Sequence, residues 1–197
     1  MSSFLALRDQ LSAPIIAAPM FLVSNPTLAL GTCAQGMIGS FPAHGTRSPE
    51  MLAQWLDEMD AGIRELKAHK GVDAIAPYAV NVVVHASNPR MKGDLDLLEK
   101  RQVPIVITSK SAPGDVVRRI HDYGGLVLSD IATRRHAEKC AQAGVDAVIA
   151  VCGGAGGHCG RINPFALINE IREVFDGPIV LAGGITTGQD VLAAQVM

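Results

Sequence analysis

The residues best suited to binding a phosphorylated ligand lie in two glycine-rich segments, 153–160 and 182–184, each placed directly after a run rich in Val, Ile and Ala. Glycine lacks a Cβ atom, so its backbone N–H can approach a ligand closely, and successive N–H groups form concavities that bind phosphate. His158 stands inside the first segment. Histidine is the commonest general acid or base and also contacts phosphate, so both interpretations of His158 stay open.

Further polar side chains lie in the last residues of the other apolar runs or in the loops that follow them. They are His44, Asn81, His85, Ser109, Lys110 and Asp130. Lys110 could neutralise a phosphate or face solvent, and Asp130 could bind a ligand hydroxyl or simply end a strand. Cys152, His158 and Cys159 match no common zinc spacing and have no evident fourth ligand, so we expect no metal.

The composition indicates a globular protein that acts on a small molecule. The 197 residues are 48% hydrophobic and 18% charged, with a net charge of -2, which argues against disorder and against nucleic-acid or membrane-surface partners. Residues 10–46 carry no charge, but prolines divide them into pieces too short to cross a bilayer. The N-terminus has no secretory pattern and the four cysteines form no disulfide framework, so we expect a cytoplasmic protein.

Seven apolar runs alternate with stretches of helical periodicity, and no linker composition interrupts them. The runs are 15–20, 37–42, 78–84, 103–110, 126–131, 147–152 and 178–184. They are apolar on both faces, as strands of a covered parallel sheet are. Asn-Pro or Ser-Pro pairs at 25–26, 48–49, 88–89 and 163–164 predict helix starts, while Gly144 and Gly177 predict helix ends.

Continuous β/α alternation gives either a doubly wound open sheet or a (β/α)₈ TIM-type barrel. A dinucleotide-binding open sheet carries G-x-G-x-x-G after its first strand, whereas here the first run ends in Ala-Ala-Pro-Met. The pattern therefore predicts an α/β (β/α)₈ barrel with about seven β/α units, forming a single domain over 1–197 that is incomplete at its C-terminal end. Active sites of this fold lie at the carboxyl ends of the strands.

Four segments resemble the nitronate monooxygenase family, formerly called 2-nitropropane dioxygenases. They are Ala17-Ala18-Pro19-Met20, Asn81 within 78–82, the loop 154–160 with its A-G-G-H-x-G pattern, and 180–185. The resemblance runs from about Ala13 to the last residue and implies an FMN-dependent TIM barrel. Members of this family commonly carry a Gln ahead of the glycine loop, where this sequence has Val151-Cys152.

The resemblance implies specific roles for these segments. His158 would act as general base beside the nitro group, and nitronates or nitroalkanes would be oxidised with O₂ to a carbonyl compound and nitrite. Ala18, Pro19 and Met20 would line the isoalloxazine ring and Asn81 would hydrogen-bond it. The ribityl chain and phosphate would be held by Gly156, Gly157, Gly183 and Gly184.

The sequence leaves two alternatives open. Related flavin barrels share much of the loop, so an FMN- and NAD(P)H-dependent enoyl-thioester reductase is the first. The second is a truncated chain that binds FMN or another phosphate ligand weakly without catalysis, since a (β/α)₈ barrel typically has about 250 residues. Unpaired strand edges in such a chain would favour self-association into a homo-oligomer.

Overall fold

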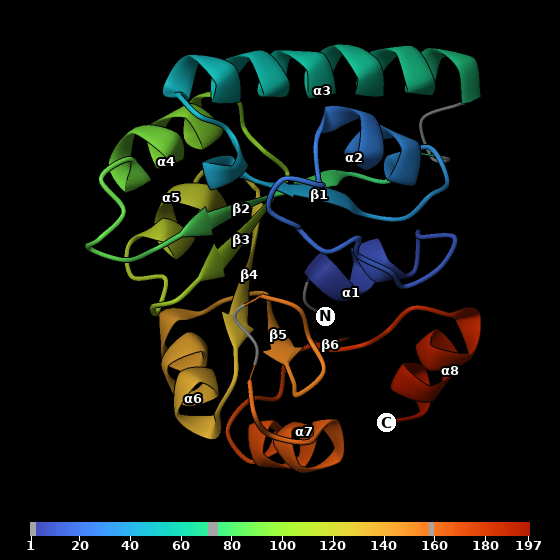
Figure 1. The fold of residues 1–197 in the computed structure, drawn as a ribbon, viewed down its shortest axis with the longest axis vertical. Helices are drawn as coiled ribbons and strands as arrows, with labels where there is room; N and C mark the ends of the chain where they lie inside the picture. The colour runs from blue at the N-terminus through green and yellow to red at the C-terminus, as the bar shows by residue number, and fades with distance from the viewer. Residues whose placement is uncertain (1–2, 71–74, 158–159) are drawn as a thin grey trace.

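The computed structural model describes residues 3–70, 75–157 and 160–197, and it shows an α/β protein built on one parallel sheet (Figure 1). The strands are β1 (Gly39–Pro42), β2 (Tyr78–Val83), β3 (Ile105–Ser109), β4 (Leu126–Ile131), β5 (Ala147–Val151) and β6 (Ile179–Ala182). The helices are α1 (Ser3–Arg8), α2 (Pro26–Cys33), the short 3-10 turn η1 (Ala43–Gly45), α3 (Pro49–Lys70), α4 (Met91–Lys100), α5 (Val116–His121), α6 (Arg134–Ala143), α7 (Pro164–Arg172) and α8 (Gly188–Val196).

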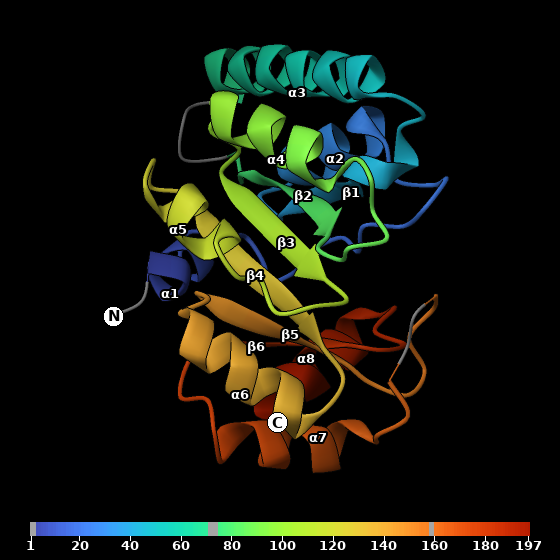
Figure 2. The ribbon, with the colours of Figure 1, turned by 90° about the vertical axis from the view of Figure 1, so that its left-hand side faces the viewer.

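The strands lie in the sheet in the same order as in the chain, β1-β2-β3-β4-β5-β6, and every neighbouring pair is parallel. A doubly wound sheet reverses its strand order at a switch point, and this sheet does not. Figure 2 shows the strands turning steadily from β1 to β6 as the sheet curls. The architecture is therefore a six-stranded, curled half-barrel.

The predicted first strand, 15–20, forms only one bridge, between Ile16 and Ile38. Ile38 N–H donates to Ile15 O at 3.1 Å, and Ala17 N–H donates to Ile38 O at 2.9 Å. Continuing this parallel ladder would need an N–H from Pro19, which proline lacks. The Ser40 hydroxyl donates to Ala17 O instead. The described residues thus form a sheet of six strands, and the prediction of about seven β/α units is not confirmed.

Side chains on the two faces of the sheet enter two different cores. The convex face packs Val80, Val106, Val127 and Val148 with buried side chains from the helices. The concave face buries a second cluster, in which Phe4 of α1 lies with strand side chains that include Ile105. The alternation of side chains along each strand therefore separates a helix-covered face from an inner face.

Three of the four proline-marked helix starts are confirmed. The side chains of Asn25, Ser48 and Asn163 each accept a hydrogen bond from a backbone N–H in the first turn of α2, α3 and α7. Asn88 is the exception, because its Oδ1 accepts from Arg90 N–H in a local turn and α4 begins only at residue 91. The proline after Asn88 lies in that turn instead of opening the helix.

Of the two predicted helix ends, Gly144 is confirmed and Gly177 is wrong. Gly144 adopts a left-handed conformation with φ of 78°, and its N–H donates to Cys140 O and Ala141 O at the end of α6. Helix α7 ends at Arg172, five residues before Gly177. The Arg172 guanidinium donates to Gly177 O, so this glycine belongs to the turn that enters β6.

Both edges of the sheet carry accessible apolar side chains. Every residue of β6 is half-buried, α8 has no buried residue, and Leu192 and Val196 are exposed. On the other edge, Leu28 of α2 and Val23 border a hollow of about 710 Å³. Self-association through these edges stays a prediction. Within the described ranges, no helix combines the length and apolarity that a membrane span requires.

Candidate functional site

Three polar side chains meet on the inner face at the carboxyl ends of β2, β3 and β4. Asn81 is buried, and its Nδ2 donates to Ile107 O at 3.1 Å and to Ser109 Oγ at 2.6 Å. Ser109 Oγ in turn donates to Asp130 Oδ2 at 2.5 Å. This hydrogen-bonded chain lies one side-chain layer above the apolar floor formed by Ala79 and its neighbours.

The environment of Asp130 makes its carboxyl unusual among the described acids. Burial raises the pKa of Asp130 from 3.8 to about 6, and the hydrogen bond from Ser109 opposes part of that change. Burial also raises the pKa of the Cys140 thiol on α6; the hydrogen bond with Ser129 opposes that, and the charge of Asp130 adds to it. A carboxyl whose pKa is raised to about 6 at the carboxyl end of a barrel strand is a candidate functional group.

The glycine-rich loops after β5 and β6 lie against each other through their backbones. A Cβ at Gly183 would stand 3.3 Å from Cys152 Cβ, and one at Gly154 would stand 3.8 Å from the backbone of Gly183. Gly154, Gly157, Gly183 and Gly184 all have positive φ, at 104°, 70°, 140° and 75°. The positive φ at these four positions favours glycine, and at Gly183 an added Cβ would also stand closer to Cys152 than an ordinary van der Waals contact.

The first glycine loop is anchored at both ends. Gly153 N–H donates to Ile162 O at 3.0 Å, and Gly160 N–H donates to Val151 O at 3.2 Å. By contrast, no acceptor among the described residues takes a hydrogen bond from the N–H groups of the four predicted phosphate ligands, Gly156, Gly157, Gly183 and Gly184. Anchored loops with available N–H groups form the kind of concavity that binds an anion.

The third part of the site is the loop after the first extended segment. Ser24 closes this loop, because its Oγ accepts from Met20 N–H at 2.9 Å and donates to Ala18 O at 3.1 Å. Beyond Pro19, the apolar residues 20–23 are exposed, and the Phe21 ring stacks on His44 with centroids 5.5 Å apart. The segment predicted to line a flat ring thus offers backbone groups and exposed apolar surface.

The predicted site residues separate into three groups in the structure. Ala18, Pro19 and Met20 follow the first extended segment, which pairs with the sheet only at Ile16; Asn81 lies in β2; and the four glycines lie in the loops after β5 and β6. His158 lies outside the described residues; Gly157, the residue before it, is described. Phe21 and Ser24 were not predicted as site residues, although the apolar residues 21–23 directly after the first predicted strand were an available signal.

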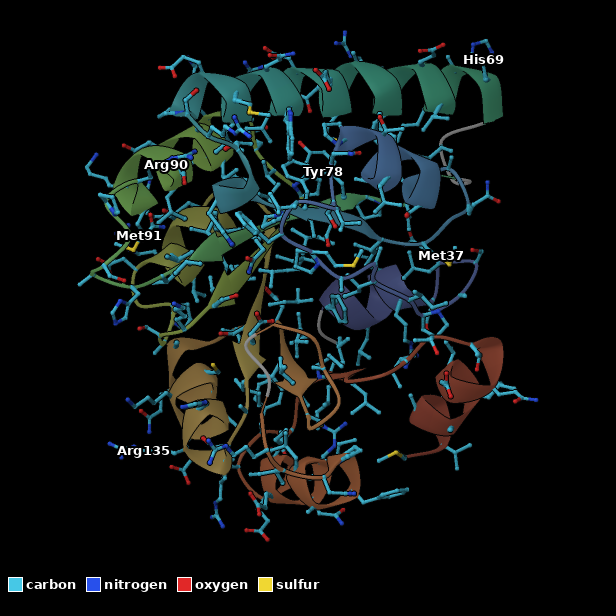
Figure 3. All side chains as sticks on the ribbon, in the orientation of Figure 1. Met37, His69, Tyr78, Arg90, Met91 and Arg135 are labelled. Atoms are coloured by element: carbon cyan, nitrogen blue, oxygen red, sulfur yellow. The ribbon has the colours of Figure 1, made fainter. Side chains whose placement is uncertain are left out.

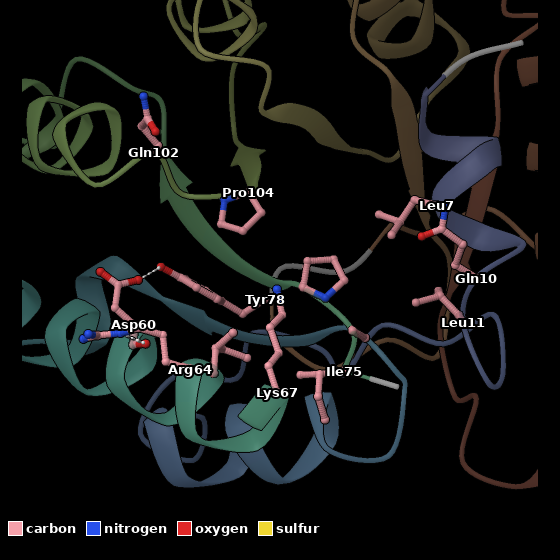
Figure 4. A pocket seen from close by; sticks show the side chains of 13 residues that line it. Leu7, Gln10, Leu11, Asp60, Arg64, Lys67, Ile75, Tyr78, Gln102 and Pro104 are labelled. Carbon is pink, nitrogen blue, oxygen red and sulfur yellow. Dashed lines mark hydrogen bonds between the residues drawn. The ribbon is translucent and has the colours of Figure 1, made fainter. Parts of the chain in front are cut away.

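A separate hollow of about 670 Å³ lies at the opposite end of the strands (Figure 4). Arg64 and Lys67 of α3 line it together with Tyr78 and Pro104, which stand at the N-terminal ends of β2 and β3. Tyr78 Oη donates to Asp60 Oδ1 at 3.3 Å within this lining. Because the glycine loops follow the carboxyl ends, this hollow is not part of the predicted site.

The family model for nitronate monooxygenase matches residues 73–197, which contain all of β2 to β6 and both glycine loops. The chain belongs to the nitronate monooxygenase family. The match covers more than half of the chain and includes Asn81, His158, Gly183 and Gly184, four of the residues on which the resemblance was based.

Two similar proteins are named for different activities. The chain is 28% identical to nitronate monooxygenase of Pseudomonas aeruginosa, over 92% of this chain and 61% of that protein. It is also 28% identical to (3aS,4S,5R,7aS)-5-hydroxy-7a-methyl-1-oxo-octahydro-1H-indene-4-carboxyl-CoA dehydrogenase of Rhodococcus jostii, over 92% of this chain and 47% of that protein. The chain therefore spans about half to three fifths of the length of these relatives.

Solved structures agree with the fold. FabK from Thermotoga maritima superposes with a TM-score of 0.82 at 25% identity, over 97% of this chain and 58% of that one. Nitroalkane oxidase from Streptomyces ansochromogenes superposes with a TM-score of 0.79 at 27% identity, over 96% and 64%. Nitronate monooxygenases are flavoproteins, and the available glycine N–H groups, together with a buried amide on the same edge, fit a flavin phosphate and ring.

Proposed function

We propose that this chain forms the FMN-binding part of a flavin-dependent oxidoreductase, with the cofactor at the carboxyl edge of the half-barrel. The supporting observation is the glycine cradle, in which two neighbouring loops bring positive-φ glycines together. Gly156, Gly157, Gly183 and Gly184 would hold the ribityl chain and phosphate through their N–H groups. All of these groups belong to one sheet, so the proposed site lies within a single domain.

The ring of FMN would lie between the cradle and β2. Asn81 would hydrogen-bond it, and the backbone at Ala18, Pro19 and Met20 would line it. Exposed apolar surface at residues 20–23 supports this placement, because removing apolar groups from water under a flat aromatic ring stabilises the complex. Ser24 would keep the lining segment in place through its two hydrogen bonds.

We propose oxidation of nitronates and nitroalkanes with O₂ to a carbonyl compound and nitrite as the reaction. His158 would act as general base and remove the proton from the carbon next to the nitro group. Bound FMN would supply the electron acceptor that connects the substrate to O₂. The family match and the A-G-G-H-x-G pattern support this assignment. Substrate and O₂ are both small molecules, in keeping with a site at a loop edge.

A thioester substrate is the second candidate, and a specific observation favours it. The Rhodococcus jostii relative is named as a dehydrogenase of a carboxyl-CoA compound, and it covers as much of this chain as the nitronate monooxygenase does. Val151-Cys152 stands where members of the nitronate monooxygenase family commonly carry a Gln, and Val151 lies on the inner face at the end of β5. An FMN- and NAD(P)H-dependent enoyl-thioester reductase remains the specific form of this alternative.

Anaerobic mixing experiments distinguish these candidates, with binding of FMN without any turnover as the third outcome. The purified chain is loaded with FMN, and the flavin absorbance is followed after addition of a preformed nitronate or of NADH. Bleaching by the nitronate alone supports the monooxygenase, and bleaching by NADH supports the reductase. If neither bleaches the flavin and an oxygen electrode shows no O₂ consumption, the chain binds FMN without catalysis.

The role of His158 is tested with His158→Asn. This variant should lose turnover of a neutral nitroalkane, whose proton must be removed, and keep turnover of the preformed nitronate. His69→Asn is the matched control, because His69 is exposed near the end of α3, far from the carboxyl edge (Figure 3). Equal loss with both substrates, or loss with neither, contradicts the assignment of His158 as base.

A further inference from the structure

The hydrogen bonds around Asn81 determine which way its side-chain amide points. A carbonyl oxygen cannot donate a hydrogen bond, so the amide atom that faces Ile107 O must be the nitrogen, Nδ2. The second Nδ2 hydrogen points to Ser109 Oγ at 2.6 Å. Both hydrogens are thereby used inside the protein, and the amide oxygen, Oδ1, is the atom left to face outward.

The direction of the chain is set at its other end. An ionised carboxylate only accepts hydrogen bonds, so the Ser109 hydroxyl must give its proton to Asp130 Oδ2. The lone pairs of Ser109 Oγ then face Asn81, and they can receive a hydrogen only from Nδ2. Asp130 therefore fixes the orientation of Ser109, and Ser109 Oγ together with Ile107 O fixes that of the Asn81 amide.

Asn81 Oδ1 is the open end of this chain. Within the described part of the chain, no donor forms a hydrogen bond with this oxygen. It is also not one of the solvent-inaccessible polar atoms that lack a partner; among the described residues, Arg90 Nε alone is of that kind. The residue as a whole is 5% exposed, and an oxygen that is neither hydrogen-bonded nor sealed from solvent contributes to that small area. An oxygen of this kind accepts hydrogen bonds and does not donate them.

We propose that Ser109 and Asp130 are positioning residues that hold the Asn81 amide with Oδ1 toward the ligand, so that the site selects a ligand N–H or O–H at this point. Oxidised isoalloxazine carries one ring N–H, at N3, and its other ring heteroatoms only accept. Asn81 Oδ1 therefore accepts from N3–H of FMN. This deepens the proposed function and rests on it for the choice of FMN as ligand.

The charge on Asp130 is felt by few neighbours. No described cation forms an ion pair with it; Ser109 on β3 is its hydrogen-bond donor, and Cys140 on α6 is the titratable group whose pKa it affects. Protonation of Asp130 weakens it as an acceptor and loosens Ser109. The orientation of Asn81 is consequently best defined when Asp130 is ionised.

The first test uses the ligand-free chain and therefore does not depend on FMN. Proton–nitrogen NMR follows the two side-chain amide hydrogens of Asn81 as the pH is varied. We expect both to exchange slowly and to shift with a midpoint near pH 6, in line with the pKa of Asp130. Asp130→Asn should remove the shift. Fast exchange of one hydrogen, or an unchanged titration in the variant, overturns the proposal.

The second test measures binding of FMN and of 3-methyl-FMN, which lacks the N3 hydrogen. The intact chain should bind FMN about tenfold more tightly than the methylated form, as expected for one lost hydrogen bond to a buried acceptor. Ser109→Ala should reduce this preference to about twofold or less. Equal binding of the two flavins by the intact chain refutes selection of N3–H.

Thr108→Val is the matched control for Ser109→Ala. Thr108 precedes Ser109 on β3, and its buried hydroxyl lies within hydrogen-bond distance of Leu128 O and Ser129 Oγ, but it lies on the convex face. This variant should keep the preference for FMN over 3-methyl-FMN. If the preference is lost in Thr108→Val as well, removal of any hydroxyl from β3 disturbs binding, and the assignment to Ser109 is overturned. If the intact chain binds neither flavin, the proposed function fails, while the NMR result still decides the orientation of Asn81.

Discussion

Replacing Asp130 by Asn should stabilise the protein, and more so as the pH rises. The carboxyl has a pKa of about 6 in the folded protein against 3.8 as its ordinary value, because burial disfavours the charged form. Between these two values the folded state keeps a proton that the unfolded state has released. The free energy of unfolding therefore falls as the pH rises from about 4 to about 6 and stays lowered above that window.

The size of the effect follows from the two pKa values. The pKa difference between 3.8 and about 6, at about 1.36 kcal/mol for each pKa unit, lowers the free energy of unfolding by about 3 kcal/mol at pH 8. Asparagine has the same shape, cannot ionise, and can still accept from Ser109. The variant should match the original chain near pH 4 and exceed it by 2–3 kcal/mol, as an order-of-magnitude estimate, at pH 8.

Urea unfolding followed by circular dichroism at pH 4, 6 and 8 measures this difference. Asp115→Asn serves as control, because Asp115 is exposed at the start of α5 and its side chain caps nothing. The control should follow the original chain within about 0.5 kcal/mol at every pH. If Asp130→Asn also runs parallel to the original chain from pH 4 to pH 8, Asp130 has no raised pKa and the reasoning is refuted.

Three further substitutions test the cradle and the packing. Gly183→Ala should weaken FMN binding at least about tenfold in a fluorescence titration, because φ is 140° and the new Cβ would stand 3.3 Å from Cys152; unchanged affinity would exclude Gly183 from the cradle. Gly39→Ala should cost more than about 3 kcal/mol in urea unfolding, since its Cβ would lie 2.2 Å from Ala29 O; a loss below 1 kcal/mol, on the same approximate scale, would mean that α2 yields easily. Asn25→Ala should cost about 1 kcal/mol in the same assay, and no loss would show that this cap contributes nothing to α2.

Apolar runs in the sequence located all six strands, because strands buried on both faces have no other pattern. The same rule wrongly extended the first run to a full strand. The apolar character of a run does not show whether each residue has a backbone N–H to donate. Pro19 has none, so the next hydrogen bond of the ladder, to the Ser40 carbonyl, cannot form. Likewise, an Asn-Pro pair does not by itself show where a helix starts. The Asn25 side chain accepts from Leu28 N–H in the first turn of α2, whereas the Asn88 side chain accepts from Arg90 N–H in a local turn before α4.

The location of the glycine loops and of Asn81 at the carboxyl edge was predictable, because it depends on local sequence at strand ends. The link from Asn81 through Ser109 to Asp130 was not, although each residue was a separate candidate. Their sequence separations are 28 and 21 residues, and only the parallel register of three strands brings them together on one face. The stacking of the Phe21 ring on His44 was likewise not predictable, because it depends on how two separate segments meet in space.

The strand order has a consequence for how the protein is made. Each strand pairs with the one synthesised just before it, so the sheet grows at a single edge and no strand has to be inserted between two others. Paired residues are separated by 39 positions between Gly39 and Tyr78 but by only 21 between Ile105 and Leu126. A growing chain can therefore add one unit after another as it leaves the ribosome, with each unit stabilised by the units already in place.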